Sequence, residues 1–274
     1  MFVLLGNRGY VGREFERQLL SRSLPFLPLG RRECDVYDVE ALVKRLEADD
    51  ATALINCAGY TGKPNVDACE LDKTNCLMGN AVLPGVIARA CEEVGIPWGH
   101  VSSGCIYTGR RSDGEGFTEE DPPNFSFRQN NCSFYSGTKA LGEEILADAQ
   151  KCYIWRLRIP FSNIDSSRNY LSKVMRYDTL LEAENSLSNL PEFVSAAIDC
   201  CEKQLPFGIY NLTNPGSVTT SEVVELIREV GVTDREFKFF ASEEEFMQRA
   251  ASTPRSNCVL DSQKAIDAGL KLSP

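Results

Sequence analysis

The chain has 274 residues, 43% of them apolar, and a formal net charge of −10 from 29 basic and 39 acidic side chains. That length suits one sizeable core with a small appended lobe, the negative charge argues against nucleic acid as a partner, and no apolar run approaches the length of a membrane span. Eleven cysteines without a CxxC pair, together with one histidine, lack the spacing of a zinc site, so we expect reduced thiols and no metal.

Short apolar runs with strand character alternate with stretches of helical spacing through the first part of the chain. The first run begins directly after Met1, which leaves no room for a signal peptide and favours a cytoplasmic location. The alternation predicts an α/β fold with a Rossmann-like, doubly wound parallel sheet. The expected strands are 2–5, 26–29, 53–56, 98–102 and 153–157, and the expected helices are 11–20, 39–48, 78–94 and 136–147.

Beyond Pro160 the pattern is less regular, which predicts a cofactor-binding domain over residues 1–160 and a small substrate-binding lobe over 161–274. A further helix at 190–203 and a strand at 208–212 indicate that the chain returns to the sheet at about 189–213. Thr219 and Glu222 have the spacing of a capping box, so a helix is expected from there through Val230.

Three glycines follow the first expected strand and open the first expected helix. Such a turn bends tightly and lets a pyrophosphate approach the helix N-terminus. We therefore predict a dinucleotide site. Its predicted residues are Gly6, Asn7, Arg8, Gly9, Tyr10, Val11 and Gly12 in the turn, and Cys57, Ala58 and Gly59 after the third strand.

The residues after the second expected strand bear on the choice of cofactor. NAD enzymes of this fold usually place an acidic residue there, whereas this chain has Arg31 and Arg32. Guanidinium groups bind a 2′-phosphate through charge-assisted hydrogen bonds, so NADPH is favoured over NADH. The alternative is that both arginines are ordinary surface charges. Asp35 and Val36 are assigned to the adenine side of the site.

Tyr135 and Lys139 form a YxxxK pair, and residues four apart share a face of a helix. A neighbouring cation favours the phenolate and brings tyrosine closer to proton exchange at neutral pH. With Ser103 at the end of a strand, the pair predicts reduction of a carbonyl. Ser103 would donate a hydrogen bond to the substrate oxygen, Tyr135 would protonate it, and the nicotinamide would deliver hydride. Tyr135 and Lys139 would also contact the cofactor.

The glycine turn, the strand-end serine and the YxxxK pair together resemble the extended short-chain dehydrogenases/reductases. Five segments are more specifically similar to the nucleotide-rhamnose synthases, which are epimerase-reductases related to the dTDP-4-dehydrorhamnose reductases. The resemblance implies that UDP-4-keto-6-deoxyglucose is epimerised at C3 and C5 and reduced at C4 to give UDP-L-rhamnose. The segments are 56–70, 116–124, 133–139, 211–216 and 254–257.

Epimerisation requires a base on one side of the sugar and an acid on the other. If the strand stays extended beyond Ser103, Cys105 faces the same way as the serine. The resemblance implies that Cys105, in Gly104-Cys105-Ile106, and Lys173, in the segment 168–173, are the epimerase pair. The alternatives are a buried strand cysteine and a solvated helix lysine.

The remaining assignments concern the substrate and its surroundings. Arg255 is predicted to bind the diphosphate, since guanidinium groups suit paired phosphate oxygens. Ile159 is expected beside the nicotinamide, and the resemblance implies that Asn80 helps to organise Lys139. His100 is expected to be structural, packed into the sheet. The other predicted substrate contacts are Lys63, Asn65, Arg168, Asn169, Asn185 and Asn257.

Three other functions compete with the epimerase-reductase. A reductase-only dTDP-4-dehydrorhamnose reductase would need no epimerase pair. GDP-fucose synthases carry histidine where this chain has Lys173, which counts against them. A non-catalytic NADP-binding regulatory subunit is the alternative of another class, but this chain keeps Ser103, Tyr135 and Lys139. The sequence leaves open the choice between UDP and dTDP, and the formation of a homodimer.

Overall fold

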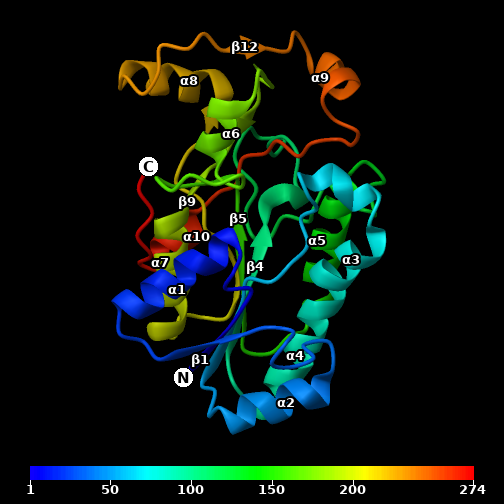
Figure 1. Ribbon diagram of the computed structural model, residues 1–274, viewed down its shortest axis with the longest axis vertical. Helices are drawn as coiled ribbons and strands as arrows, with labels where there is room; N and C mark the ends of the chain where they lie inside the picture. The colour runs from blue at the N-terminus through cyan, green and yellow to red at the C-terminus, as the bar shows by residue number, and fades with distance from the viewer.

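The computed structural model describes residues 1–274 and centres on a six-stranded sheet with helices on both faces (Figure 1). All neighbouring strands in the sheet run parallel, which confirms the expected doubly wound α/β fold. In spatial order the strands are β10 (Gly208–Asn211), β5 (Cys152–Leu157), β4 (Trp98–Ser103), β3 (Ala53–Asn56), β1 (Phe2–Leu5) and β2 (Phe26–Leu29).

The strand order reverses between β1 and β3, and ligands of open α/β sheets bind outside the carboxyl ends of the strands at such a point. The central strands read as continuous apolar runs because helices cover both faces of a parallel sheet. All six residues of β5 and all four of β3 are buried. The observed strands match the expected ranges to within one residue at each end.

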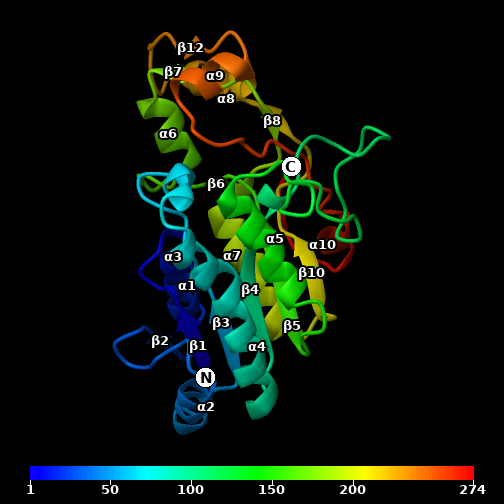
Figure 2. The same ribbon diagram turned by 90° about the vertical axis from the view of Figure 1, so that its right-hand side faces the viewer.

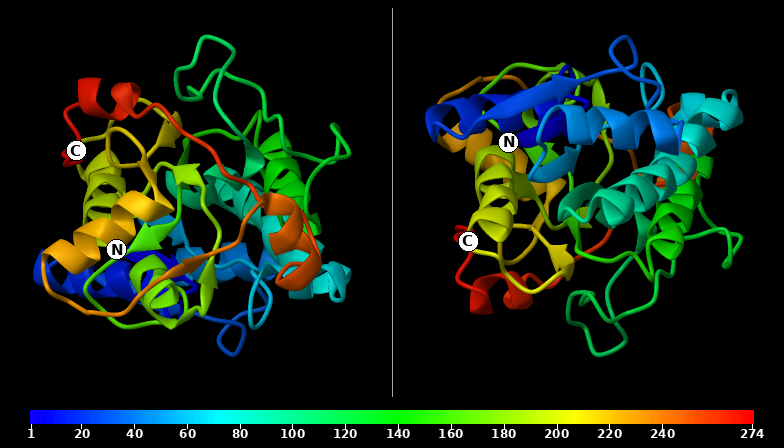
Figure 3. Two further views of the ribbon diagram at one scale, coloured as in Figure 1. Left: turned by 90° about the horizontal axis from the view of Figure 1, so that it is seen from above. Right: turned by 90° about the horizontal axis from the view of Figure 1, so that it is seen from below.

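The helices divide between the two faces of the sheet (Figure 3). On one face Phe15, Leu19 and Phe193 join α1 and α7 to the sheet in the larger core cluster. On the other, Leu42 and Ile87 belong to a second cluster under α2 and α4. The first face carries α1 (Tyr10–Ser21), α7 (Leu190–Glu202) and α10 (Gln263–Asp267); the second carries α2 (Val39–Ala48), α4 (Leu83–Val94) and α5 (Phe134–Ile145).

The helix expected at 78–94 is longer and interrupted. It begins as α3 (Lys73–Leu77), passes through a π-helical turn, η2 (Met78–Val82), and continues as α4. Pro84 has no N–H to donate and its ring crowds the carbonyl four residues earlier, which explains the widened turn. That carbonyl belongs to Asn80 and lies only 2.2 Å from where a Cβ on Gly142 of α5 would sit. The backbones of η2 and α5 are therefore in direct contact.

Beyond the carboxyl ends of the strands a smaller lobe sits over the sheet (Figure 2). It contains three helices and three two-stranded ladders. The expected capping box is present, because Thr219 and Glu222 each bond the other's backbone N–H at the start of α8. No helix of the protein has the length and apolar character to cross a membrane. The lobe elements are α6 (Tyr170–Arg176), α8 (Thr220–Glu229), α9 (Glu243–Arg249), β6 (Pro160–Phe161) with β9 (Ser188–Asn189), β7 (Thr179–Leu180) with β12 (Lys238–Phe239), and β8 (Glu184–Asn185) with β11 (Val218–Thr219).

Gly99 of β4 tests how closely the sheet packs. A Cβ added there would fall 1.9 Å from the Trp155 ring, so Gly99→Ala should lower the free energy of unfolding by about 1–3 kcal/mol. Gly85→Ala on α4 is the control, because its nearest neighbour is a methyl group of the exposed Ile145 side chain at 3.0 Å and alanine favours the helix. Urea unfolding of both variants gives the comparison; equal stability of the two would contradict this account of the packing.

Candidate active site

The glycine turn is held against the loop that follows β3. Gly6 has a φ of +81°, and a Cβ there would lie 2.5 Å from the backbone nitrogen of Ala58. A Cβ on Gly12 would lie 2.2 Å from the Gly6 carbonyl oxygen. Helix α1 begins one residue after Gly9, which provides no side-chain cap, so its first N–H groups remain available to an anion. A side chain at Gly6 or Gly12 would collide with the neighbouring backbone and disrupt the glycine turn.

A cavity of about 570 Å³ opens in front of this turn. Both guanidinium-bearing residues after β2 line it; Arg31 donates to the Tyr37 hydroxyl at 3.2 Å and lies over the Tyr37 ring. The arginines and the free N–H groups of the glycine turn are donors that could hold phosphate groups in this cavity. Of the predicted cofactor residues it is lined by Gly6, Asn7, Arg8, Gly9, Arg31, Arg32, Val36, Cys57, Ala58 and Gly59.

Gly12, Tyr135, Lys139 and Ile159 are absent from this lining, and three further predicted cofactor residues make contacts elsewhere. The Tyr10 hydroxyl bonds to that of Ser162 at 2.8 Å, and Val11 packs on the core under α1. The Asp35 carboxylate accepts the N–H of Tyr37, so it closes a local turn. Sequence reasoning missed Tyr37 itself, which lines the cavity; no spacing rule marks a tyrosine in this loop.

Tyr135 and Lys139 both belong to α5. The helix begins two residues before the expected start because the Ser133 hydroxyl caps it by accepting from the N–H of Ser136. Burial raises the pKa of Tyr135 well above its ordinary value, while a hydrogen bond with Ser103 opposes that rise. Burial also lowers the pKa of Lys139. The expected lowering of the tyrosine pKa by the lysine is therefore outweighed by burial.

Cys105 lies beside Tyr135, but not through the strand alternation that the sequence predicted. The strand does not stay extended: β4 ends at Ser103, whose hydroxyl accepts from the N–H of Cys105 at 3.2 Å and starts a short 3-10 turn, η3 (Gly104–Ile106). Cys105 and Tyr135 pack in the same cluster. Burial raises the pKa of the Cys105 thiol. The thiol is thus a neighbour of the phenol, held by a turn instead of by strand alternation.

Asn80 does not bond to Lys139. Its side chain accepts from the N–H of Tyr60 and donates to the Tyr60 carbonyl, both at 2.8 Å, and donates to the hydroxyl of Thr138 at 3.1 Å. It therefore ties the loop after β3 to α5 and affects the lysine only through the helix.

One turn beyond Lys139, the buried Glu143 carboxylate accepts from the Arg156 guanidinium of β5, with a closest distance of 2.7 Å, and from the Ser102 hydroxyl of β4. Only 2% of the arginine side chain and 6% of the glutamate side chain are exposed. The ion pair fixes α5 to β5, and the Ser102 hydrogen bond fixes it to β4, the strand that ends at Ser103.

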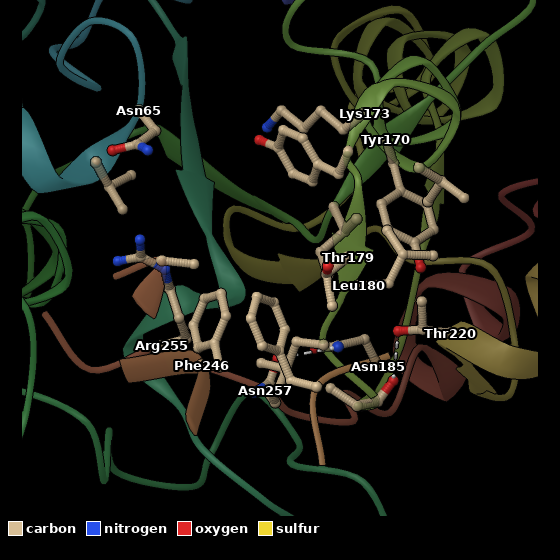
Figure 4. A pocket seen from close by; sticks show the side chains of 18 of the residues that line it. Asn65, Tyr170, Lys173, Thr179, Leu180, Asn185, Thr220, Phe246, Arg255 and Asn257 are labelled. Atoms are coloured by element: carbon tan, nitrogen blue, oxygen red, sulfur yellow. Dashed lines mark hydrogen bonds between the residues drawn. The ribbon is translucent and has the colours of Figure 1, made fainter. Parts of the chain in front are cut away.

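A second cavity, of about 640 Å³, lies between the sheet and the lobe (Figure 4). The side chain of Lys173 extends from α6 into it, and its amine makes no hydrogen bond or ion pair with the protein. Burial, followed by Arg168 and Arg255, lowers the pKa of its amine. Of the other predicted residues, it is lined by Asn65, Ile159, Arg168, Asn185, Arg255 and Asn257.

The predicted diphosphate residue Arg255 is already paired within the protein. Its two terminal nitrogens donate to the Asp67 carboxylate at 2.6 and 2.8 Å, and its guanidinium lies over the Phe246 ring. Arg168 donates to the Gly62 carbonyl at 2.5 Å. Both arginines therefore bridge the lobe to the loop after β3 while facing the cavity.

Two predicted substrate residues do not line this cavity. Asn169 is 2% exposed and caps α6, accepting from the N–H of Leu171 and donating to the carbonyls of Ser162 and Ile164. Its amide is fully used, so it shapes the lobe and has no donor for a substrate. Lys63 is exposed on the loop. The sequence also gave no sign of Arg158, a buried cavity residue that donates to the Asn185 side chain.

A protein-family model described as the RmlD substrate binding domain matches residues 1–273. A bifunctional dTDP-4-dehydrorhamnose 3,5-epimerase/dTDP-4-dehydrorhamnose reductase from Arabidopsis thaliana is 32% identical over 268 residues, which are 96% of this chain and 85% of the relative. Against a trifunctional relative from the same plant, whose name adds a UDP-glucose 4,6-dehydratase, the chain spans only 38% of the relative's length.

Two solved structures share the fold. The UDP-rhamnose synthase of Acanthamoeba polyphaga mimivirus superposes with a TM-score of 0.91 at 22% identity, covering 99% of this chain and 94% of that one. The dTDP-4-dehydrorhamnose reductase of Bacillus anthracis in complex with NADP gives 0.82 at 18% identity, covering 100% and 94%.

The buried ion pair yields a stability prediction. Glu143→Gln leaves the Arg156 charge without its partner, and removing one member of a buried pair costs about 3–5 kcal/mol of unfolding free energy. Glu144→Gln is the matched control, since the neighbouring glutamate pairs with the exposed Arg128 and such a pair contributes about 1 kcal/mol at most. Urea unfolding of both variants gives the comparison. If Glu143→Gln lost as little unfolding free energy as the control, the buried pair would not stabilise the fold as described.

Proposed function

Because the chain belongs to the RmlD substrate-binding domain family, we propose that it is an NADPH-dependent reductase of nucleotide-linked 4-keto-6-deoxyhexoses that first epimerises its substrate. The substrate proposed is UDP-4-keto-6-deoxyglucose and the product UDP-L-rhamnose. The observation that carries the proposal is the partly buried Lys173 amine, which lies in the second cavity without a hydrogen-bond or ion-pair partner in the protein.

The reduction is assigned to the end of β4 and the first turns of α5. NADPH, bound at the glycine turn, supplies the hydride for C4. Tyr135 is the acid: burial keeps its phenol protonated at neutral pH, so that it can donate to the developing alkoxide. Ser103 donates a second hydrogen bond to the same oxygen. Lys139 shares a face of α5 with Tyr135 and completes the group on that side of the site. Polarising the ketone also acidifies the hydrogens at C3 and C5.

The epimerase step is assigned to Lys173 and Cys105. Burial lowers the pKa of Lys173 and so favours its neutral amine, which is the form that removes a proton from carbon. The raised pKa of Cys105 keeps its thiol protonated, which suits the group that returns a proton to the opposite face. The two residues come from different elements, α6 and the turn after β4, as inversion requires.

We place the cofactor in the domain of residues 1–160 and the sugar nucleotide mainly against residues 161–274. The cationic side chains of the second cavity suit a diphosphate, and Arg255 would bind it through the donors that Asp67 leaves free. Uridine as the base follows from the resemblance alone. The second candidate, a reductase without epimerase activity, is favoured by the apolar packing around Cys105.

The deciding experiment follows the sugar hydrogens by NMR in deuterated water, with UDP-4-keto-6-deoxyglucose and with or without NADPH. Deuterium should enter C3 and C5, and rhamnose should form when NADPH is present. Cys105→Ala should slow the exchange by about 10²–10⁴-fold, the usual worth of an acid or base. Cys258→Ala is the matched control, because Cys258 packs in the same cluster and its thiol donates only to the Gly104 carbonyl. Reduction without exchange would leave a simple 4-reductase.

The cofactor assignment has its own test. Replacing Arg31 and Arg32 together with alanine should raise the KM for NADPH by about 10–100-fold, since hydrogen bonds to charged groups contribute about 1.5–3 kcal/mol. The KM for NADH, which lacks the 2′-phosphate, should change far less. Arg128→Ala removes an exposed arginine elsewhere and should change neither value. Steady-state kinetics with both cofactors check this. Equal effects on the KM values for NADPH and NADH would show that the two arginines are ordinary surface charges.

A further inference from the structure

The second cavity is a cationic part of an acidic protein. The chain carries a formal net charge of −10, yet five of the residues that line this cavity are basic and only Asp178 is acidic. Two of its arginines are neutralised by carboxylates outside the lining, Arg255 by Asp67 and Arg176 by Asp165. The remaining cations give the cavity a positive potential, which favours an anionic ligand.

Arg158 and Arg168 are the cavity arginines without a carboxylate partner. Arg158 donates to the Asn185 side-chain oxygen and to the Ser256 carbonyl, and Arg168 donates to the Gly62 carbonyl at 2.5 Å. Neutral acceptors of this kind satisfy hydrogen bonds but leave the charge uncompensated. A guanidinium group has five N–H donors, more than these bonds use. Both arginines therefore keep donors for an anion.

Lys173 adds a nucleophile to these cations. Its side chain extends across the cavity toward Asn65 and Arg255, and its amine has no hydrogen-bond or ion-pair partner in the protein (Figure 4). Burial lowers the pKa of this amine, and the charges of Arg168 and Arg255 lower it further. Only a neutral amine attacks a carbonyl carbon, and desolvation or neighbouring cations activate a lysine for that reaction.

We propose that the cavity also binds small aldehydes that carry a phosphate group, and that Lys173 forms a reversible imine with them. The lone pair of Nζ attacks the carbonyl carbon to give a carbinolamine. The carbonyl oxygen then leaves as water with both protons of the amine, and a carbon–nitrogen double bond forms. No oxidant or reductant takes part, and water reverses the reaction. This reactivity goes beyond the proposed epimerase-reductase and requires only the cavity.

The phosphate group determines which aldehydes bind. A cavity of about 640 Å³ is large enough for a phosphorylated aldehyde with a ring. We assign the phosphate to Arg168, since its charge acts on the Lys173 amine and its guanidinium has free donors. An aldehyde without the phosphate loses this contact and should react more slowly.

The other lysines of the chain lack this combination of features. Burial also lowers the pKa of Lys139, but its amine donates to the Val101 carbonyl and it lines neither cavity. Lys44 of α2 is exposed and lies outside both cavities, so it serves as the internal comparison.

The probe is pyridoxal 5′-phosphate, a phosphorylated aldehyde whose imines absorb visible light. The protein is incubated with it at pH 7 without NADPH and then treated with borohydride, which reduces the imine to a stable secondary amine. Peptide mass spectrometry identifies the modified lysines. Lys173 should be modified at least about tenfold faster than Lys44, because more of its amine is neutral at that pH. A rate at Lys173 no higher than at Lys44 overturns the inference.

Three variants separate the amine from the phosphate contact. Lys173→Arg keeps the positive charge but forms no imine, so the rapid modification should vanish. Arg168→Gln should slow the reaction with pyridoxal 5′-phosphate by about tenfold, and slow that with pyridoxal, which lacks the phosphate, much less. Arg176→Gln is the matched control, because Asp165 already neutralises this cavity arginine, and it should change neither rate. Equal rates for the two aldehydes with the unaltered protein would show that no phosphate is bound.

Adding UDP distinguishes this inference from the proposed function. If the sugar nucleotide occupies the same cavity, UDP should protect Lys173 and leave the modification of Lys44 unchanged. Rapid modification of Lys173 that UDP does not prevent would contradict the proposed nucleotide-sugar site while supporting the imine. Protection by UDP of a Lys173 that reacts no faster than Lys44 would do the reverse.

Discussion

One buried carboxylate holds the reactive part of this protein together. Glu143 of α5 accepts from Ser102 of β4 and Arg156 of β5, so three elements that are distant in sequence meet at one group. The residue after Ser102 is the strand-end serine, and Lys139 lies one turn before Glu143. An ion pair in a low dielectric resists separation far more than a surface pair does. The buried pair therefore fixes the positions of the serine, the tyrosine and the lysine relative to one another.

The two cavities acquire their character from what surrounds this centre. The cofactor cavity is built from strand ends and turns, where backbone donors and two arginines suit phosphates. The second cavity is closed by the lobe, whose cations are mostly already paired, as Arg255 is with Asp67. Lys173 differs because its partly buried amine has no partner in the protein, and a group with a shifted pKa in a cleft is a candidate functional residue.

The sequence predicted well whatever depends on neighbours in the chain. Strand ends, the glycine turn, the Thr219 capping box and the YxxxK pair all follow from periodicity or short spacing. It failed where the hydrogen bonds of an individual side chain decide its role. Asn169 looked like a ligand residue but caps α6, and Cys105 was placed by strand alternation although a turn holds it. His100 was assigned to packing because nothing in its neighbourhood names Asn56 or Lys139.

The closing wall of the second cavity comes late in the chain. Arg255 and Asn257 belong to a segment that runs on beside the loop after β4, where Cys258 bridges Gly109 and Leu260 bridges Phe117. Strands β1 to β5 and the glycine turn are complete about a hundred residues earlier in the order of synthesis. On the ribosome, however, α7, β10 and α10 emerge later, and they complete the sheet and the core on its α1 face, so the cofactor half and the wall of the second cavity finish folding together near the end of synthesis.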